Sequence, residues 1–276
     1  MRKNISGYCR LRMMLLFVIS ASLFMISWSG KEKKDKEITG PVTTLKLVPG
    51  ENNPRNSEGS FITLKNGQIL FVYSRYTGDS SSDHAPAFLA GRFSDDGGKT
   101  WTKDDKIIIP NEGGMNVMSV SLLRLQNGDI ALFYLLKNST VDCIPQMRIS
   151  KDEAESWSNP IPVITDKKGY FNDRVIQLES GRLIMAVALH NTPDGKWKSQ
   201  GDLYSYYSDD DGQTWFSSDK VPNTTDIITQ EPGLIGLKDG RIMMYIRASG
   251  GFQQLSFSSD RGKTWSPVET SNISSP

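Results

Sequence analysis

Four segments of this 276-residue chain share one pattern: an apolar strand, a two-residue turn with glycine second, and another apolar strand. Asn-Gly and Asp-Gly pairs between apolar runs predict β-hairpins, with both turn residues at positive φ. Successive turn glycines stand 61, 53 and 59 residues apart, and no amphipathic helical stretch interrupts them. A period of this length is typical of propeller blades, so we expect an all-β fold. The four turns are Asn66-Gly67, Asn127-Gly128, Ser180-Gly181 and Asp239-Gly240.

A second motif, S-x-D-x-G-x-T-W, follows each hairpin. Its Ser and Asp side chains can accept nearby backbone N–H groups, its glycine can adopt a positive φ, and its tryptophan can anchor the turn in the core. Because the motif recurs on every repeat, it predicts a scaffold element and not a single catalytic or metal site. The copies are Ser94–Trp101, Ser208–Trp215, Ser258–Trp265 and Ser150–Trp157, the last with Ala154 in place of glycine.

These residues resemble the Asp-box, or bacterial neuraminidase (BNR), repeat, and their arrangement is similar to that of the sialidases. The resemblance covers about residues 45 to 276 and implies an all-β propeller of the sialidase type. The family has six blades and about four are present here, so we expect a propeller that is incomplete at its C-terminus. Sialidases place a third arginine and the nucleophilic tyrosine in blades five and six. We therefore expect the 276-residue chain to hydrolyse sialosides very slowly or not at all.

The resemblance implies an exo-α-sialidase, a retaining glycosidase that releases terminal sialic acid from glycoconjugates. Non-catalytic propellers also carry Asp boxes, so a sialic-acid- or glycan-binding propeller is the alternative, and a purely structural Asp-box module is a third. Neither a cofactor nor a metal is implied. The expected partner is a sialylated glycan. With 32 basic and 31 acidic residues, a nucleic-acid binder driven by bulk positive charge is excluded.

The N-terminus has the pattern of an export signal. A basic start is followed by an uncharged apolar run, Met13–Trp28, that is shorter than the roughly 20 residues of a membrane span. Ser27 and Ser29 fit a cleavage site, so we predict a signal peptide at 1–29, a linker at 30–44 and a secreted, periplasmic or cell-surface protein without a membrane span after signal removal. An uncleaved membrane anchor is the alternative. Cys143 then remains as the single cysteine, which favours a buried structural role.

The substrate of a sialidase sets the requirements for its site. Sialic acid carries a carboxylate, which arginines grip with paired hydrogen bonds. Sialidases attack with a tyrosine, activated by a glutamate, while an aspartic acid protonates the leaving oxygen. Arg55 matches the position of the family's first carboxylate-binding arginine, although Asn56-Ser57 replaces the usual Ile-Pro that follows it. Glu231 and Arg247 resemble the tyrosine-activating glutamate and the second arginine, and antiparallel pairing brings both to one rim.

The acid is expected between the first hairpin and its Asp box. Asp83, in Asp83-His84-Ala85, is the first choice and Asp79 the alternate, and an Asx-turn aspartate is the structural alternative for either. We expect Arg75 to point into the same cleft. His84 can tune the acid or serve the loop alone. By repeat equivalence, Arg174 and His190 are further candidates for substrate contact.

Overall fold

The computed structural model describes residues 42–166, 174–192 and 194–275. All regular elements in these ranges are β-strands, and sixteen of them form four four-stranded sheets. This confirms the all-β propeller architecture. The expected signal peptide, residues 30–41 of the expected linker, and the segment Asn172-Asp173 lie outside the described residues. A search of the described part of the chain for a helix able to cross a membrane finds none.

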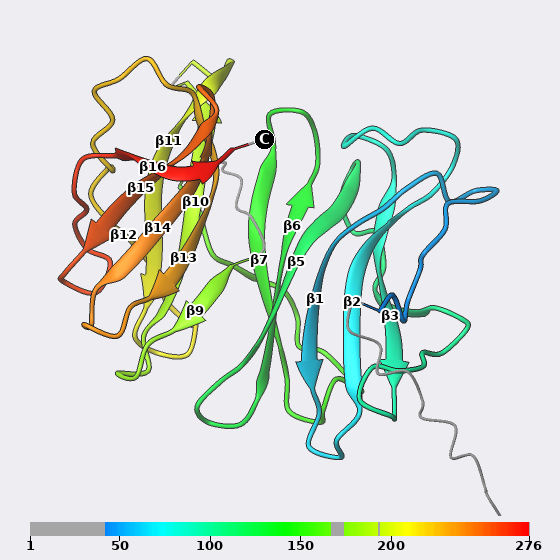
Figure 1. The fold of residues 1–276 in the computed structure, drawn as a ribbon. Helices are drawn as coiled ribbons and strands as arrows, with labels where there is room; N and C mark the ends of the chain where they lie inside the picture. Colours follow the sequence, from blue (N-terminus) through cyan, green and yellow to red (C-terminus); the bar gives the residue numbers. More distant parts are fainter. Residues whose placement is uncertain (1–41, 167–173, 193, 276) are drawn as a thin grey trace, which may run out of the picture. The chain divides into compact units, whose positions relative to one another are not determined.

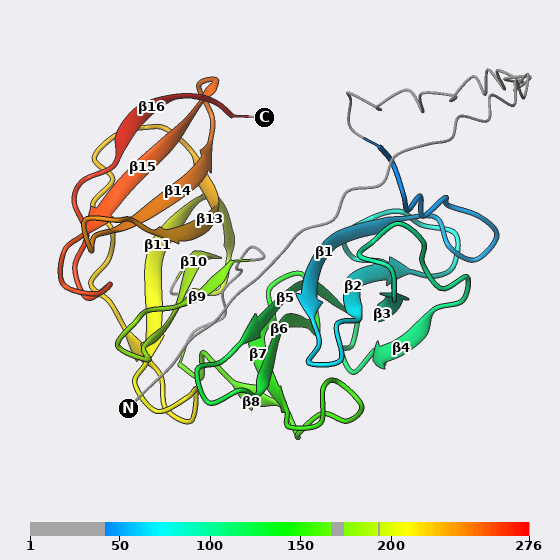
Figure 2. The same ribbon diagram turned by 60° about the horizontal axis from the view of Figure 1, so that its bottom comes forward.

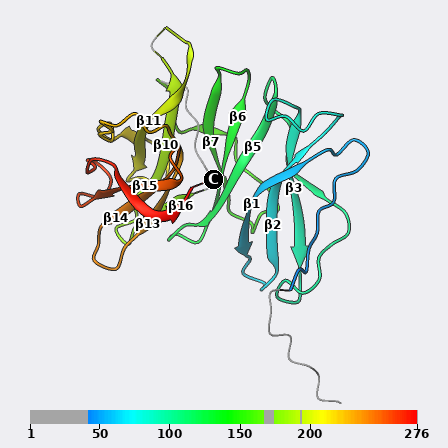
Figure 3. The same cartoon turned by 45° about the horizontal axis from the view of Figure 1, so that its top comes forward.

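Each sheet is an antiparallel meander of consecutive strands, and we call the sheets blades one to four in chain order. Figures 1 and 3 show the blades following one another from blue to red. In Figure 2 the first strands of the blades (β1, β5, β9 and β13) lie nearest the centre. The strands are β1 (Asn56–Thr63), β2 (Ile69–Tyr76), β3 (Ala87–Ser94), β4 (Lys106–Ile109), β5 (Asn116–Arg124), β6 (Ile130–Lys137), β7 (Cys143–Ser150), β8 (Ile161–Pro162), β9 (Val175–Gln177), β10 (Leu183–Asn191), β11 (Trp197–Ser208), β12 (Phe216–Ser217), β13 (Thr229–Gly236), β14 (Ile242–Ala248), β15 (Phe252–Ser258) and β16 (Glu269–Ser274).

The hairpin turns are one residue longer than the sequence pattern suggested. In the first, Gly67 N donates to Leu64 O at 2.9 Å and Leu64 N donates to Gln68 O at 2.8 Å. Gly67 has φ of 88°, but Asn66 is not at positive φ. The expectation of two positive-φ residues is therefore wrong. A three-residue turn that ends in a left-handed glycine needs only that glycine, so the preceding residue varies freely among Asn, Ser and Asp.

The Asp boxes make the internal hydrogen bonds expected of them. Ser94 Oγ accepts from Gly98 N at 2.8 Å, and Asp96 Oδ1 accepts from the backbone N–H of Thr100 at 2.8 Å. The copy that lacks glycine keeps this geometry, because Ala154 itself adopts φ of 68° and donates its N–H to Ser150 Oγ at 2.8 Å. The motif is a scaffold turn in all four blades.

The core consists of apolar layers between neighbouring blades. Leu70 and Val72 of blade one pack with Leu132 of blade two. The other two interfaces are built in the same way, since alternate residues of the second strands face opposite neighbours. Blades two and three share Phe133, Met147, Met185 and Tyr206, and blades three and four share Ile184, Ala186, Met244 and Trp265. Cys143 is a fully buried free thiol, whose pKa burial raises to about 12.

Candidate functional site

A pocket of about 650 Å³ collects residues from all four blades. Its lining comes from the beginnings of β1, β5, β11 and β13, the ends of the second strands β6, β10 and β14, the residue that precedes β1, and the loops that follow β2 and β6. Antiparallel pairing brings the start of a first strand and the end of a second strand to the same rim. The repeat therefore delivers one set of side chains per blade to one mouth.

A β-bulge near the start of the first strand aims a side chain into this pocket in three blades. The register breaks between Ser57 and Gly59, between Met118 and Ser121, and between Gln230 and Pro232. The bulged residues Glu58, Ser119 and Glu231 have φ of 38°, 56° and 43°, and all three line the pocket. Bulges re-aim side chains beside active sites, and left-handed backbone in residues other than glycine is strain that concentrates at functional sites.

On the blade-one side, Arg55 is the central cation. Its Nη1 forms an ion pair with Asp83 and donates to Ser81 O at 3.2 Å. Its guanidinium lies 4.7 Å from the ring centroid of Tyr76, a cation–π contact that fixes its plane. Asp83 is held in turn through its backbone carbonyl, which accepts from Asn116 Nδ2 at 2.9 Å and from Lys137 Nζ at 3.2 Å.

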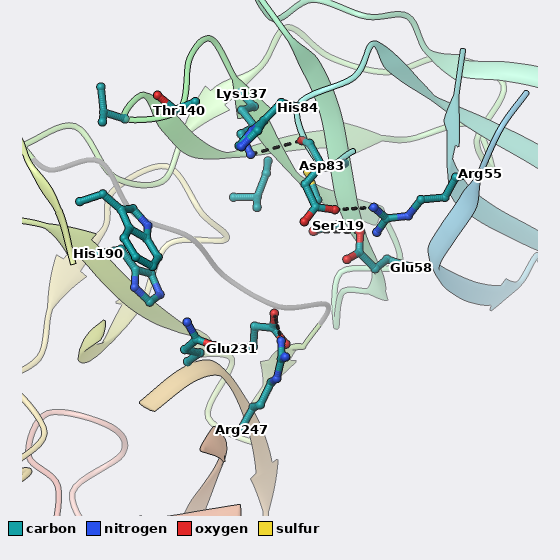
Figure 4. A pocket seen from close by; sticks show the side chains of 15 residues that line it. Arg55, Glu58, Asp83, His84, Ser119, Lys137, Thr140, His190, Glu231 and Arg247 are labelled. Carbon is teal, nitrogen blue, oxygen red and sulfur yellow. Dashed lines mark hydrogen bonds and ion pairs between the residues drawn. The ribbon is translucent and has the colours of Figure 1, made fainter. Parts of the chain in front are cut away.

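On the blade-four side, Glu231 and Arg247 form a pair. Arg247 Nη1 donates to Glu231 Oε1 at 2.7 Å, and the two side chains are 43% and 50% exposed. Figure 4 shows this pair across the pocket from Arg55 and Asp83. Arg55 and Arg247, from blades one and four, thus line the same pocket.

Glu58 lies on the Arg55 side and differs from the other carboxyls of the pocket. Its Oε2 accepts from Ser119 Oγ at 3.2 Å. Burial raises its pKa above the ordinary glutamate value, although nearby Arg55 opposes that rise. The sequence interpretation did not select Glu58.

On the blade-three side, the pocket has an aromatic wall. His190 stacks on Trp197 with ring centroids 5.6 Å apart and an angle of 12° between the planes. His190 Nδ1 lies 2.9 Å from Lys198 O, and burial lowers the pKa of the imidazole. Trp197 remains largely exposed. A stacked pair of this kind offers an apolar surface to the face of a sugar ring.

Of the sequence candidates, six line this pocket and three do not. The six are Arg55, Asp83, His84, His190, Glu231 and Arg247.

The residues outside the lining are Arg75, Arg174 and Asp79. Arg75 points away from the expected cleft, because its Nη1 pairs with Asp105, which also binds Arg92. Alternation along β2 explains this: Tyr76, the next residue, is the one that faces Arg55.

Glu58 and Ser119, the bulge residues that the sequence interpretation missed, carry a signal in the sequence. Like Glu231, which it selected, each stands nine residues before the turn glycine of its hairpin (Gly67, Gly128 and Gly240). Aligning the repeats on that glycine, and not only on the strands, identifies Glu58 as the equivalent of Glu231.

The same alignment identifies Lys137, which stands nine residues after Gly128 as His190 stands nine residues after Gly181. Trp197 lacks such a signal, because β11, at whose start it lies, is longer than the third strands of the other blades.

In the described ranges, His, Cys, Asp and Glu side chains form no group of three or more that could hold a metal ion. Two of the pocket's three carboxyl groups, those of Asp83 and Glu231, are paired with Arg55 and Arg247.

Four blades that share one rim, with two arginine–carboxylate pairs in the pocket at that rim, define a β-propeller with a polar pocket at its mouth. Comparison with known proteins agrees. The BNR repeat-like domain family matches residues 88–276, and the chain belongs to this family, among the sialidase-type β-propellers.

Two curated relatives are bacterial sialidases. The chain is 28% identical to one from Clostridium perfringens, over 87% of this chain and 69% of that protein. It is 29% identical to one from Paraclostridium sordellii, over 75% of this chain and 56% of that protein. The chain thus spans between about half and about two thirds of their length. Among solved structures, the NanB sialidase of Streptococcus pneumoniae is similar in fold, with a TM-score of 0.62 and 16% identity over 84% of this chain and 54% of that one.

Proposed function

We propose that this protein acts on sialylated glycans as an exo-α-sialidase of the retaining type, with the described pocket as its sialic-acid site. The observation that carries the proposal is the convergence of Arg55 and Asp83 from blade one with Glu231 and Arg247 from blade four. The two sialidase relatives support it. We also propose that the protein is exported, on the strength of the N-terminal sequence pattern.

Arg55 and Arg247 bind the ligand carboxylate. Both guanidiniums are already engaged with carboxylates, Asp83 and Glu231, which occupy the places that a ligand carboxylate would take. A ligand carboxylate therefore replaces the carboxylate of Asp83 or Glu231 and does not have to remove water from an unpaired guanidinium, so the free-energy cost of desolvation stays small. Release of Asp83 from Arg55 frees its carboxyl group to take up a proton and donate it to the glycosidic oxygen.

Glu231 serves as the base that activates the nucleophile. When the ligand takes its place on Arg247, the Glu231 carboxylate, which is half exposed at the pocket surface, is free to accept a proton. In the sialidase scheme, the nucleophile is a tyrosine, because a carboxylate would be repelled by the substrate's own charge. The aromatic wall of His190 and Trp197 faces the remaining part of the sugar.

Binding of N-acetylneuraminic acid, measured by calorimetry, tests the proposal. We expect the free acid to bind and its methyl ester, which has the same shape without the charge, to bind at least tenfold more weakly, because the ester offers the arginines no anion. Equal affinity for acid and ester, or no binding of either, contradicts the proposed site. Turnover of a fluorogenic sialoside by the same preparation separates hydrolysis from binding alone.

A glycan-binding propeller without hydrolysis is the second candidate. The Arg55–Asp83 ion pair favours it, because an aspartate that stays paired with arginine is a poor proton donor. Binding without turnover supports this candidate.

A further inference from the structure

Of the three pocket carboxyl groups, that of Glu58 is the one that the proposed function does not use. It occupies the same bulge in blade one that Glu231 occupies in blade four, and both carboxyls line the pocket. Their surroundings differ. Glu231 pairs with Arg247, whereas no ion pair within residues 42–166, 174–192 and 194–275 includes Glu58. The equivalent bulges of blades one and four thus place two carboxyl groups in one pocket, and of these two Glu231 is the one that forms an ion pair.

The groups that face Glu58 come from four elements besides its own. Ser119 on β5 donates its hydroxyl proton to Glu58 Oε2. Arg55, just before β1, attracts the charged form, while Asp83 after β2 and Glu231 on β13 repel it. Tyr76 on β2 lies close enough for Glu58 to raise the pKa of its phenol.

Most of these influences favour the uncharged acid. Burial is the largest of them, and the two neighbouring carboxylates act in the same direction. Arg55 and the hydrogen bond from Ser119 act in the opposite direction and favour the charged form, but the Nη1 of Arg55 is already directed to Asp83. A positive φ at this residue, 38°, holds the side chain in the pocket although that backbone conformation costs about 1 kcal/mol.

A bound carboxylate ligand strengthens this preference. It would neutralise Arg55, the cation that favours a charged Glu58, and it would add a negative charge beside the carboxyl. An acid next to a carboxylate can donate a short O–H···O hydrogen bond, whereas two carboxylates repel each other.

We propose that Glu58 contacts the bound sugar acid as an uncharged carboxylic acid, donating a hydrogen bond to the ligand carboxylate, so that binding takes up a proton at this residue. The inference rests on the proposed function for the ligand class, a carboxylate-bearing sugar. The proton comes from solvent and no covalent bond changes. Glu58 is thus a ligand-binding residue that makes anion recognition dependent on pH.

Calorimetry of N-acetylneuraminic acid binding in two buffers of different ionisation enthalpy measures the proton uptake. For the wild-type chain we expect binding to take up protons. As pH rises from the pKa of Glu58 in the free protein to its pKa in the bound protein, the affinity should weaken by up to tenfold per pH unit. Glu58→Gln keeps a hydrogen-bond donor without a titratable proton, so ligand binding to this variant should take up fewer protons than binding to the wild type, by the share that Glu58 contributes, and its affinity should depend less on pH over that range. Glu155→Gln makes the same chemical change outside the pocket, on a side chain that is 78% exposed, and should behave as the wild type.

A ligand-free measurement keeps the inference testable if Glu58→Gln folds poorly. In wild-type protein with ¹³C-labelled glutamate, the Glu58 carboxyl carbon should titrate above the ordinary glutamate range. Titration of Glu58 at or below that range overturns the inference, and so does ligand binding without proton uptake, while the proposed function survives both. Absence of ligand binding at every pH overturns the two together.

Discussion

Replacing Arg247 with alanine should separate binding from stability. The Arg247–Glu231 pair is half exposed on both sides, and such surface ion pairs contribute about 0–1 kcal/mol to folding. A ligand carboxylate held by the same guanidinium gains charge-assisted hydrogen bonds worth about 2–4 kcal/mol, which corresponds to roughly 30- to 700-fold in Kd. We therefore expect a large loss of affinity for N-acetylneuraminic acid with little change in the free energy of unfolding.

Arg182→Ala is the control variant: it makes the same substitution at a buried arginine outside the pocket, where stability and not ligand affinity should change. The side chain of Arg182 is only 4% exposed, donates to both carboxylate oxygens of Asp209 at 2.7 and 2.6 Å, and stacks 4.2 Å from the ring centroid of Tyr207. It lies outside the pocket lining. Arg182→Ala should cost about 2–3 kcal/mol of stability through the lost hydrogen bonds, ring contact and packing, and leave Kd unchanged.

Urea unfolding and calorimetric binding on the two variants and the wild type form the assay. The expected pattern is a crossed one: Arg247→Ala loses affinity and Arg182→Ala loses stability. The reasoning is refuted if Arg247→Ala lowers the free energy of unfolding by more than about 2 kcal/mol, or if it binds the ligand as tightly as the wild type.

Three further results are expected. Gly212→Ala should lower the free energy of unfolding in urea by about 2–4 kcal/mol, because its Cβ would lie 2.4 Å from Met147 Cε at a φ of 88°. Gly98→Ala, whose Cβ would meet nothing nearer than 3.7 Å, should lower it by only about 1 kcal/mol. Equal losses for the two variants would contradict this reasoning, and in a Met147→Ala background the two losses should become equal. Hydrogen bonds from Thr100 lower the pKa of Asp96 to about 2, below its ordinary value of 3.8. The contribution of Asp96 to stability is therefore complete above about pH 4 and is lost as pH falls toward 2. Asp96→Asn should flatten that part of the curve of stability against pH, and an unchanged curve below pH 4 would contradict this reasoning. The Cys143 thiol, whose pKa burial raises to about 12, should react with a thiol reagent only at the rate of unfolding, and rapid labelling of native protein would show that the β7 core is open.

The hairpin and Asp-box patterns predicted the fold because they act locally. A left-handed glycine closes each hairpin, and Ser and Asp side chains bond to backbone groups a few residues away. Such interactions need no distant partner, so four copies in the sequence became four blades. The one local error, two positive-φ residues per turn, arose because a two-residue and a three-residue hairpin turn can share the same Asn-Gly signature.

The site was only partly predictable. Strand alternation and hairpin pairing correctly brought Glu231 and Arg247 to one rim. The prediction for Arg75 failed because alternation along β2 turns its side chain away from the pocket, where it pairs with Asp105. Glu58 escaped notice because a bulge shifts which residues face the pocket, and periodicity alone does not locate a bulge.

The amino-acid sequence by itself determined the architecture: four repeats of one hairpin and one Asp box, whose bonds lie within a few residues of each other. Only the tertiary structure decided the chemistry of the mouth. Three interactions in the pocket depend on where the first strands bulge and where loops of unequal length return. They are the ion pair of Arg55 with Asp83, the hydrogen bond of Glu58 with Ser119, and the stacking of His190 on Trp197. The burial of a side chain and the charges that act on it depend on all the elements that surround the site. These surroundings form only once the blades have packed against one another.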